Sequence, residues 1–223
     1  GFGLEFLESP DSPDPNWADL KDTLKNISDE DIIQKFYSNG VNRGKSISIS
    51  INEIIRERLS ILDWLPEANI FNPEDENHPD PSSASKRFRL DFAKKDIAVE
   101  VAFNHGEAIS WNLLKPVLSS ELNHVQKEVQ TKIGVIITAT ENMKKSGGFD
   151  GAVGTYEKFL RYLIMMNTQL VCPIVIVGLD APTSFKIKHY TIPSKSGKLG
   201  LVYQNGKRIV PLGEEDFAHI QSK

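Results

Sequence analysis

The chain has 223 residues, 39% of them hydrophobic and 25% charged, which is the composition of an ordinary globular protein of about one domain. It has no run of about 18 apolar residues, and this excludes a transmembrane helix. Its single cysteine, Cys172, lies in an apolar segment and has no partner within the chain, so we expect a buried thiol and a cytoplasmic protein.

The charge is distributed unevenly, although the formal net charge of the chain is only −4. Residues 1–85 carry a net charge of −10, whereas residues 86–223 carry +6. This asymmetry fits a protein with one side that faces a polyanion such as DNA. The alternative interpretation is chance clustering of charged residues.

Apolar residues at helical spacing predict three helices in the acidic half. Asn16 is expected to cap the first helix, Ser28 begins a variant capping box before the second, and Ser50 is expected to cap the third. The alternating run Lys45–Ile51 predicts a short strand. Residues 72–85 have no apolar period and predict a long loop.

The stretch RFRLDFAKKDIAVEVAFNHGEA, residues 87–108, contains the two acids that are the main candidates for a catalytic site. Asp91 leads into a turn at Ala93–Asp96, and the alternating run Ile97–Phe103 then predicts a strand that carries Glu100. A charged Glu among small and β-branched neighbours is unfavourable unless something pairs with it. A Mg²⁺ ion shared with Asp91 would pair with it and would suit phosphodiester hydrolysis. The alternative is a solvent-facing Glu and a hairpin Asp, because the spacing alone is a weak pattern.

The elements that follow have a recognisable order. A helical period begins at residue 107, and Pro116 is expected to kink that helix or to begin it. A buried strand at Ile133–Ala139, a loop at Asn142–Gly154 and an amphipathic helix at Tyr156–Met166 come next. A second buried strand at Ile174–Leu179 and a hairpin turn at Asn205–Gly206 follow them. This order predicts an α/β fold with a mixed central β-sheet flanked by α-helices.

The segments Leu90–Asp96 and Val99–Phe103 closely resemble the catalytic hairpin of BglII/BstYI-like type II restriction endonucleases, which belong to the PD-(D/E)xK nuclease superfamily. The resemblance also takes in Trp64 and the later strand–helix–strand order, and it covers roughly residues 17–180. It implies a restriction-endonuclease-like core. It further implies a homodimer that cuts double-stranded DNA at a palindromic site, which is expected to contain GATC.

The resemblance implies roles for particular segments as well. Asp91 and Glu100 would be catalytic residues that hold Mg²⁺. The whole chain would form a single nuclease domain with an acidic helical part at 1–85, a catalytic core at 86–180 and a β-rich part at 181–223 that could recognise DNA.

The third motif position departs from the superfamily pattern. The residue two places after the second acid is usually Lys in the superfamily and Gln or Glu in close relatives, whereas here it is Ala102. On a strand it would share a face with Glu100, where a longer side chain would reach the attacking water. Three interpretations stay open: a natural variant that uses another group, an engineered inactive mutant, or a nuclease-like protein without activity.

Three neighbouring residues are further candidates for the site. Glu67 follows Trp64 by three places, where relatives carry a polar or acidic active-site residue, so it could bind a second metal or be an exposed acid in a proline turn. Asn104 and His105 follow the catalytic strand at a turn that faces DNA in the resembled family, and both residue types can read bases. His105 could also replace the missing third motif residue as a general base. The alternative is a plain strand-end turn.

Further candidate DNA-binding residues lie on two segments. Lys86 and Arg87 directly precede the hairpin and could contact phosphates. The resemblance places a base-reading loop at Lys144–Asp150, where glycines allow close backbone approach. The polar candidates in this loop are Lys144, Lys145, Ser146 and Asp150.

The leading hypothesis is therefore a Mg²⁺-dependent type II restriction endonuclease. The second is a catalytically inactive DNA-binding protein of the same fold, which Ala102 favours. The third is a structure-specific DNA repair nuclease that cuts without site preference.

Overall fold

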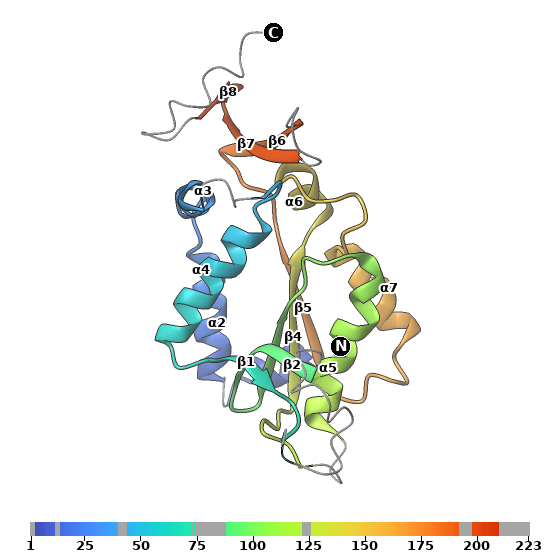
Figure 1. The fold of residues 1–223 in the computed structure, drawn as a ribbon. Helices are drawn as coiled ribbons and strands as arrows, with labels where there is room; N and C mark the ends of the chain where they lie inside the picture. The colour runs from blue at the N-terminus through green and yellow to red at the C-terminus, as the bar shows by residue number, and fades with distance from the viewer. Residues whose placement is uncertain are drawn as a thin grey trace.

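The computed structural model describes residues 3–11, 14–39, 44–72, 74, 88–121, 126–191 and 198–209. A five-stranded sheet with strand order β1-β2-β3-β4-β5 lies at its centre (Figure 1). The strands are β1 Leu65–Asn69, β2 Arg89–Lys94, β3 Ile97–Val101, β4 Ile133–Ala139 and β5 Ile174–Leu179. The first three pair antiparallel, and β3, β4 and β5 run parallel. The predicted mixed sheet is confirmed.

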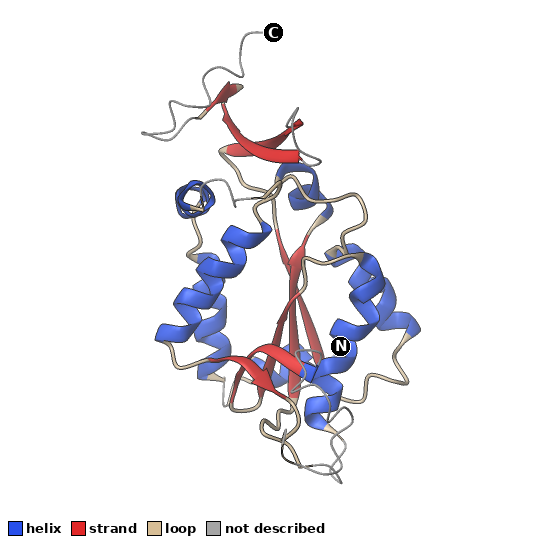
Figure 2. Ribbon diagram, in the orientation of Figure 1, coloured by secondary structure: helices blue, strands red, loops and turns tan. Residues whose placement is uncertain are grey.

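Helices cover both faces of this sheet, as Figure 2 shows. The helices are α1 Gly3–Leu7, α2 Pro15–Lys25, α3 Asp29–Ser38, α4 Ser48–Ile61, α5 Ile109–Ser120, α6 Glu141–Ser146 and α7 Tyr156–Met165. α2 and α4 lie on one side of the sheet, and α5 and α7 lie on the other. None of the helices in the described ranges is long and apolar enough to cross a membrane.

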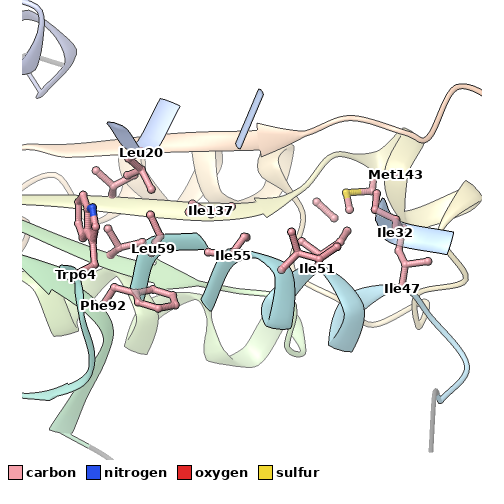
Figure 3. Close-up of a cluster of buried hydrophobic side chains, with 14 of the residues drawn as sticks. Leu20, Ile32, Ile47, Ile51, Ile55, Leu59, Trp64, Phe92, Ile137 and Met143 are labelled. Atoms are coloured by element: carbon pink, nitrogen blue, oxygen red, sulfur yellow. The ribbon is translucent and has the colours of Figure 1, made fainter. Parts of the chain in front are cut away.

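The main core lies between α4 and the sheet (Figure 3). Ile47, Ile51, Ile55 and Leu59 recur at four-residue spacing, and all four are buried. The strand predicted at Lys45–Ile51 is therefore wrong, because isoleucines that alternate with serines also fit the helical period. The cap expected from Ser50 is wrong for the same reason, since α4 already begins at Ser48 with no side-chain cap hydrogen bond.

Other predicted boundaries shift by a few residues. Asp14, not Asn16, caps α2 by accepting hydrogen bonds from the backbone amides of Asn16 and Trp17, because Pro15 begins the helix. The capping box of Ser28 is confirmed at the start of α3. Pro116 lies inside α5, near its last turn, rather than at its beginning.

One predicted turn and one predicted loop are shorter in the structure than the sequence indicated. The hairpin between β2 and β3 turns at Lys95 and Asp96 alone, because β2 continues through Lys94 and Lys95 adopts a φ of +49°. The segment expected to be a loop at 142–154 instead begins within α6. Thr140 caps that helix by accepting the backbone N–H of Met143, whose side chain is buried in the main core.

A second, three-stranded sheet follows β5, formed by β6 Phe185–Thr191, β7 Lys198–Gln204 and β8 Lys207–Arg208. Asn205 and Gly206 both have positive φ, of +51° and +79°, and this confirms the predicted two-residue turn. Ile187 and Val202 join the main core, so hydrophobic packing is continuous from α4 into this sheet. The second sheet therefore lies beside α6, at the top of the view in Figure 1.

Candidate active site

The β2–β3 hairpin brings the two predicted metal ligands together. Phe92 pairs with Val99, so the same register continued by one residue places Asp91 opposite Glu100 on one face of the sheet. The carboxylate of Asp91 also accepts a hydrogen bond from the backbone N–H of Val101 at 2.6 Å. This bond fixes the Asp91 side chain beside Glu100.

Both carboxyl groups are held in surroundings that disfavour their charge. Burial raises the pKa of Asp91, the charge of Glu67 adds to this effect, and the hydrogen bond from Val101 opposes it. Burial, followed by the charge of Asp91, raises the pKa of Glu100 to about 8. Glu100 is only 2% exposed, and its Oε1 has no hydrogen-bond partner in the described part of the chain. The pair therefore forms a site that favours a cation.

Lys115, on α5, belongs to this site, although the sequence pattern did not indicate it. Its Nζ forms an ion pair with Glu100 Oε2 and donates a hydrogen bond to the backbone carbonyl of Arg89 at 3.1 Å. Its positive charge lowers the pKa of both Asp91 and Glu100, against the larger effect of burial. The site thus contains a buried ammonium group as well as two carboxylates.

The sequence did not indicate Lys115 because the side of α5 that packs on the sheet is not the side marked by the apolar period. The apolar period that predicted the helix runs along positions that are only half-buried, whereas the buried side includes polar residues. The half-buried apolar positions are Trp111, Leu114 and Leu118, and the buried polar positions are Asn112, Lys115 and Ser119. Polar residues at spacings of three and four within an apolar segment were the available signal.

Ala102 lies just after β3 and continues its hydrogen-bonding pattern, since its backbone N–H donates to Ile137 at 2.8 Å. Its side chain is 1% exposed and belongs to an apolar cluster with Ile109, Leu113 and Phe159. A polar group at position 102 would therefore point into packed hydrocarbon.

Glu67 is exposed, as the alternative interpretation predicted, but it lies on β1 and not in a proline turn. The pairs Pro66–Phe92 and Ala68–Leu90 place Glu67 opposite Asp91. Its φ of +50° is unusual for a residue with a Cβ, and such strain is concentrated at functional sites. Its carboxylate pairs with Arg56 Nη2 at 2.6 Å.

Asn104 and His105 follow the end of β3, and both are exposed. Asn104 accepts a hydrogen bond from the side chain of Asn112 at 3.0 Å, which ties it to α5. His105 forms a β-bridge with Val153, and its charge contributes to the low pKa of Asp150. His105 therefore lies beside the loop that follows α6.

The segment expected to read bases is the C-terminal turn of α6 and the loop after it. Lys145 and Asp150 are exposed, Ser146 is half-buried, and Lys144 forms an ion pair with Glu141 at 3.5 Å. Asp150 pairs with Lys45 at 2.7 Å, and this contact holds the pKa of Asp150 at about 2. The other two candidate phosphate contacts, Lys86 and Arg87, lie outside the described residues.

The Asp91–Glu100 pair fits a magnesium ion. Within the described ranges, no group of three or more His, Cys, Asp or Glu side chains is arranged to hold a metal. Mg²⁺, however, is usually bound by one or two carboxylates and keeps several waters. A divalent cation would give the unpaired Oε1 of Glu100 a partner, and its charge would lower the raised pKa of both carboxyl groups.

A family model for the restriction endonucleases BglII/BglIII matches residues 2–179. The chain belongs to this family. It is therefore a restriction endonuclease by family, a class of site-specific deoxyribonucleases, and the resemblance noted in the sequence is confirmed. Among curated proteins, no sequence matches this BglII-family chain.

Two crystal structures of BglII match this chain over most of its length. The crystal structure of restriction endonuclease BglII complexed with a DNA 16-mer has a TM-score of 0.55 and 16% identity, and the match covers 88% of each chain. The crystal structure of free BglII has a TM-score of 0.43 and 16% identity, with 91% of this chain and 94% of the other covered. The DNA-bound structure confirms the restriction-endonuclease-like fold.

Proposed function

We propose that this BglII-family chain is a Mg²⁺-dependent type II endonuclease that hydrolyses phosphodiester bonds in double-stranded DNA at a palindromic site. The observation that carries the proposal is the facing pair of Asp91 and Glu100 on the β2–β3 hairpin. The burial of both carboxyl groups, and the charge of Asp91 beside Glu100, create a place for a cation.

The residues of the site divide the chemistry between them. Asp91 and Glu100 would hold the cation, and Glu67 would lie close enough to bind a second cation or a water ligand of the first. When bound, Mg²⁺ neutralises charge on the phosphate and makes a water more acidic. In the reaction, the water oxygen bonds to phosphorus and one bond from phosphorus to a sugar oxygen breaks. One proton of the water ends on that sugar oxygen, and the other stays on the new phosphate or passes to solvent.

The DNA-binding residues are proposed from their place around the hairpin. Asn104 and His105 project from the end of β3, and Lys144, Lys145, Ser146 and Asp150 lie on the adjoining α6 segment. These positions would contact the groove and backbone of a duplex. Lys86 and Arg87 stay candidates for phosphate contacts from the sequence alone. BglII has been crystallised with a DNA 16-mer, and this supports DNA as the ligand of this chain. A GATC-containing palindrome is the proposed site.

A homodimer is proposed because a palindrome matches a two-fold symmetric protein. Ile164 and Met165 on α7 are 76% and 65% exposed, and Val171 nearby is 61% exposed. Such a cluster of exposed large apolar side chains suits an interface between copies. Cys172, a buried free thiol, accords with a cytoplasmic enzyme.

A catalytically inactive DNA-binding protein is the second candidate, and Ala102 is the observation that favours it. A structure-specific repair nuclease is a weaker third. Incubation of plasmid DNA with the protein, with and without Mg²⁺, separates the three. Discrete fragments whose sequenced ends share one palindrome are the expected result. Binding to one duplex without cleavage would identify the second candidate, and cleavage without sequence preference the third.

A further inference from the structure

We propose that Lys115 supplies, from α5, the cationic side chain that the nuclease superfamily usually carries at the position of Ala102. In this role Lys115 contacts the attacking water and the scissile phosphate. The inference rests on the proposed endonuclease function, because it requires a phosphodiester beside Asp91 and Glu100.

The geometry of the ammonium group carries the inference. Nζ of Lys115 pairs with Glu100 Oε2 and donates to the carbonyl of Arg89, which lies two residues before Asp91 on the same strand. A lysine ammonium has three N–H donors. The two contacts use two of them, and within the described ranges the third remains for a water or phosphate oxygen.

The surroundings of Ala102 prevent that position from serving the same purpose. The side chain of Ala102 packs with Ile109, Leu113 and Phe159, all of which are buried. A lysine there would have to pass through this cluster before its charge reached the carboxylates. Lys115 reaches Glu100 from the helix that covers the same face, without disturbing the cluster.

Burial of Lys115 is difficult to explain by stability alone. The residue is 9% exposed, and removing an ammonium group from water is so unfavourable that apolar replacements of buried ion pairs are often neutral or stabilising. A developing negative charge on a phosphate, in contrast, is strongly stabilised by a fixed, preorganised cation. A buried lysine at position 115 is therefore better explained by a role in the reaction than by a contribution to the stability of the fold.

The chemistry needs only a protonated lysine. Its free N–H would donate to the attacking water or to a non-bridging phosphate oxygen, orienting one against the other. Its charge would balance the negative charge that gathers on the phosphoryl oxygens as the bond to the sugar breaks. Asp91 and Glu100 remain available to hold Mg²⁺ through their other oxygens.

Lys115→Met and Lys115→Arg test this role, with Lys127→Met as the matched control. Lys127 is also a partly buried lysine that donates to a backbone carbonyl of α5, that of Ser119 at 3.1 Å, but the acid beside it is Glu121 and not Asp91 or Glu100. Single-turnover cleavage, duplex binding in Ca²⁺, Mn²⁺ binding by calorimetry and the melting temperature are measured for each protein.

We expect Lys115→Met to lower the cleavage rate by about 10²–10⁴-fold, the usual contribution of one positioned group that acts on the attacking water. Duplex binding should stay within a few-fold, and Mn²⁺ should bind at least as tightly, because a neighbouring positive charge is gone. Lys115→Arg should recover part of the rate, and Lys127→Met should cut normally.

Two outcomes would overturn the inference while the proposed function stands. In one, the unmodified protein cuts and Lys115→Met cuts at the same rate. In the other, Lys115→Met loses Mn²⁺ binding, duplex binding and melting temperature together with cleavage, which would make Lys115 a structural counter-ion. A failure of the unmodified protein to cut any DNA with Mg²⁺ would instead reject the proposed function, and the inference with it.

Discussion

The carboxylate of Asp91 accepts the backbone N–H of Val101, the residue that follows Glu100, at 2.6 Å. A single hydrogen bond thus connects one predicted ligand to the strand that carries the other. The bond keeps Asp91 oriented although the pKa of its carboxyl group is raised by burial and by the charge of Glu67. The site is therefore preorganised by the backbone of the hairpin, not by the cation that it is proposed to hold.

Removal of either ligand should abolish cleavage but not DNA recognition. We expect Asp91→Ala and Glu100→Ala to lower the rate by several orders of magnitude, because each removes an oxygen ligand of the proposed Mg²⁺ ion. Duplex binding in Ca²⁺, measured by gel shift, should persist. Asp96→Ala is the matched control, since Asp96 lies in the same hairpin but pairs with Lys132 at its turn. Normal cleavage by Asp91→Ala would reject the metal site.

The sequence predicted this pair chiefly through the family resemblance, because the spacing of the two acids is by itself a weak pattern. Alternation along the strand placed Glu100 among apolar residues, but the predicted turn at Ala93–Asp96 would have set Asp91 opposite Ala98. The shorter turn at Lys95 and Asp96 sets it opposite Glu100 instead. The capping box at Ser28 and the turn at Asn205 were predicted correctly, because both depend on local hydrogen bonding or backbone conformation.

Features that depend on long-range packing could not be predicted in the same way. Lys115 was missed because the side of α5 that meets the sheet is decided by β2, β3 and β4, not by the helix sequence. The run Lys45–Ile51 fitted both a strand and a helix, and burial against Phe92 and Ile137 in the main core favoured the helix. The strand at Glu67 required the β2 partner that pairs with it.

The stability of the metal-free protein should decrease as the pH rises. The folded-state pKa of Glu100 is raised from its usual 4.5 to about 8, so the folded protein holds this proton more tightly than the unfolded chain does. Glu100 therefore contributes stability that is complete below pH 4.5 and is lost as the pH rises through about 8.

Urea denaturation in the presence of a chelator measures this effect. Between about pH 5 and pH 8, the free energy of unfolding should fall by an amount on the order of a few kcal/mol. Glu100→Gln should reduce the slope, leaving the smaller part that Asp91 contributes. Glu107→Gln, a change at an exposed acid, should leave the slope unchanged. Equal slopes in all three proteins would contradict the electrostatic account of the site.

Divalent cations should raise the melting temperature of the folded protein. A cation that binds the folded state alone stabilises it by mass action, and Ca²⁺ uses the same oxygen ligands as Mg²⁺. Differential scanning fluorimetry in increasing Ca²⁺ should show a larger rise at about pH 8 than at about pH 5, because a deprotonated Glu100 binds the cation better. Asp91→Ala should show little rise. The same rise in Asp91→Ala as in the unmodified protein would place the cation elsewhere.

Light scattering should give a mass of about twice the 25.0 kDa of one chain. Ile164→Glu, on α7, should shift the protein toward the monomer, because it introduces a charge into the exposed apolar cluster proposed as the interface. Ile61→Glu is the control, since Ile61 is 80% exposed, against 76% for Ile164, but lies at the end of α4 on the opposite side of the sheet. A monomer in the unmodified protein, both free and bound to a duplex, would contradict the dimer.

Ala102→Lys distinguishes the interpretations of the third motif position. If Ala102 replaced a functional side chain by engineering or degeneration, a lysine should raise the cleavage rate. The apolar cluster of Ile109, Leu113 and Phe159 around Ala102 predicts the opposite. Added methylenes in a packed core cost about 1–3 kcal/mol, and here an ammonium group would be buried as well.

We therefore expect Ala102→Lys to lower the melting temperature and to leave the rate of the unmodified protein unchanged or reduced. In the Lys115→Met background it should fail to restore cleavage, because its charge cannot reach Glu100 without opening the cluster. Ala102→Leu provides the packing control, since it adds a side chain of comparable bulk without a charge. A rate increase with Ala102→Lys but not with Ala102→Leu would mean that position 102 faces the attacking water, and that the side chain of Lys115 serves only to balance the charge of Glu100.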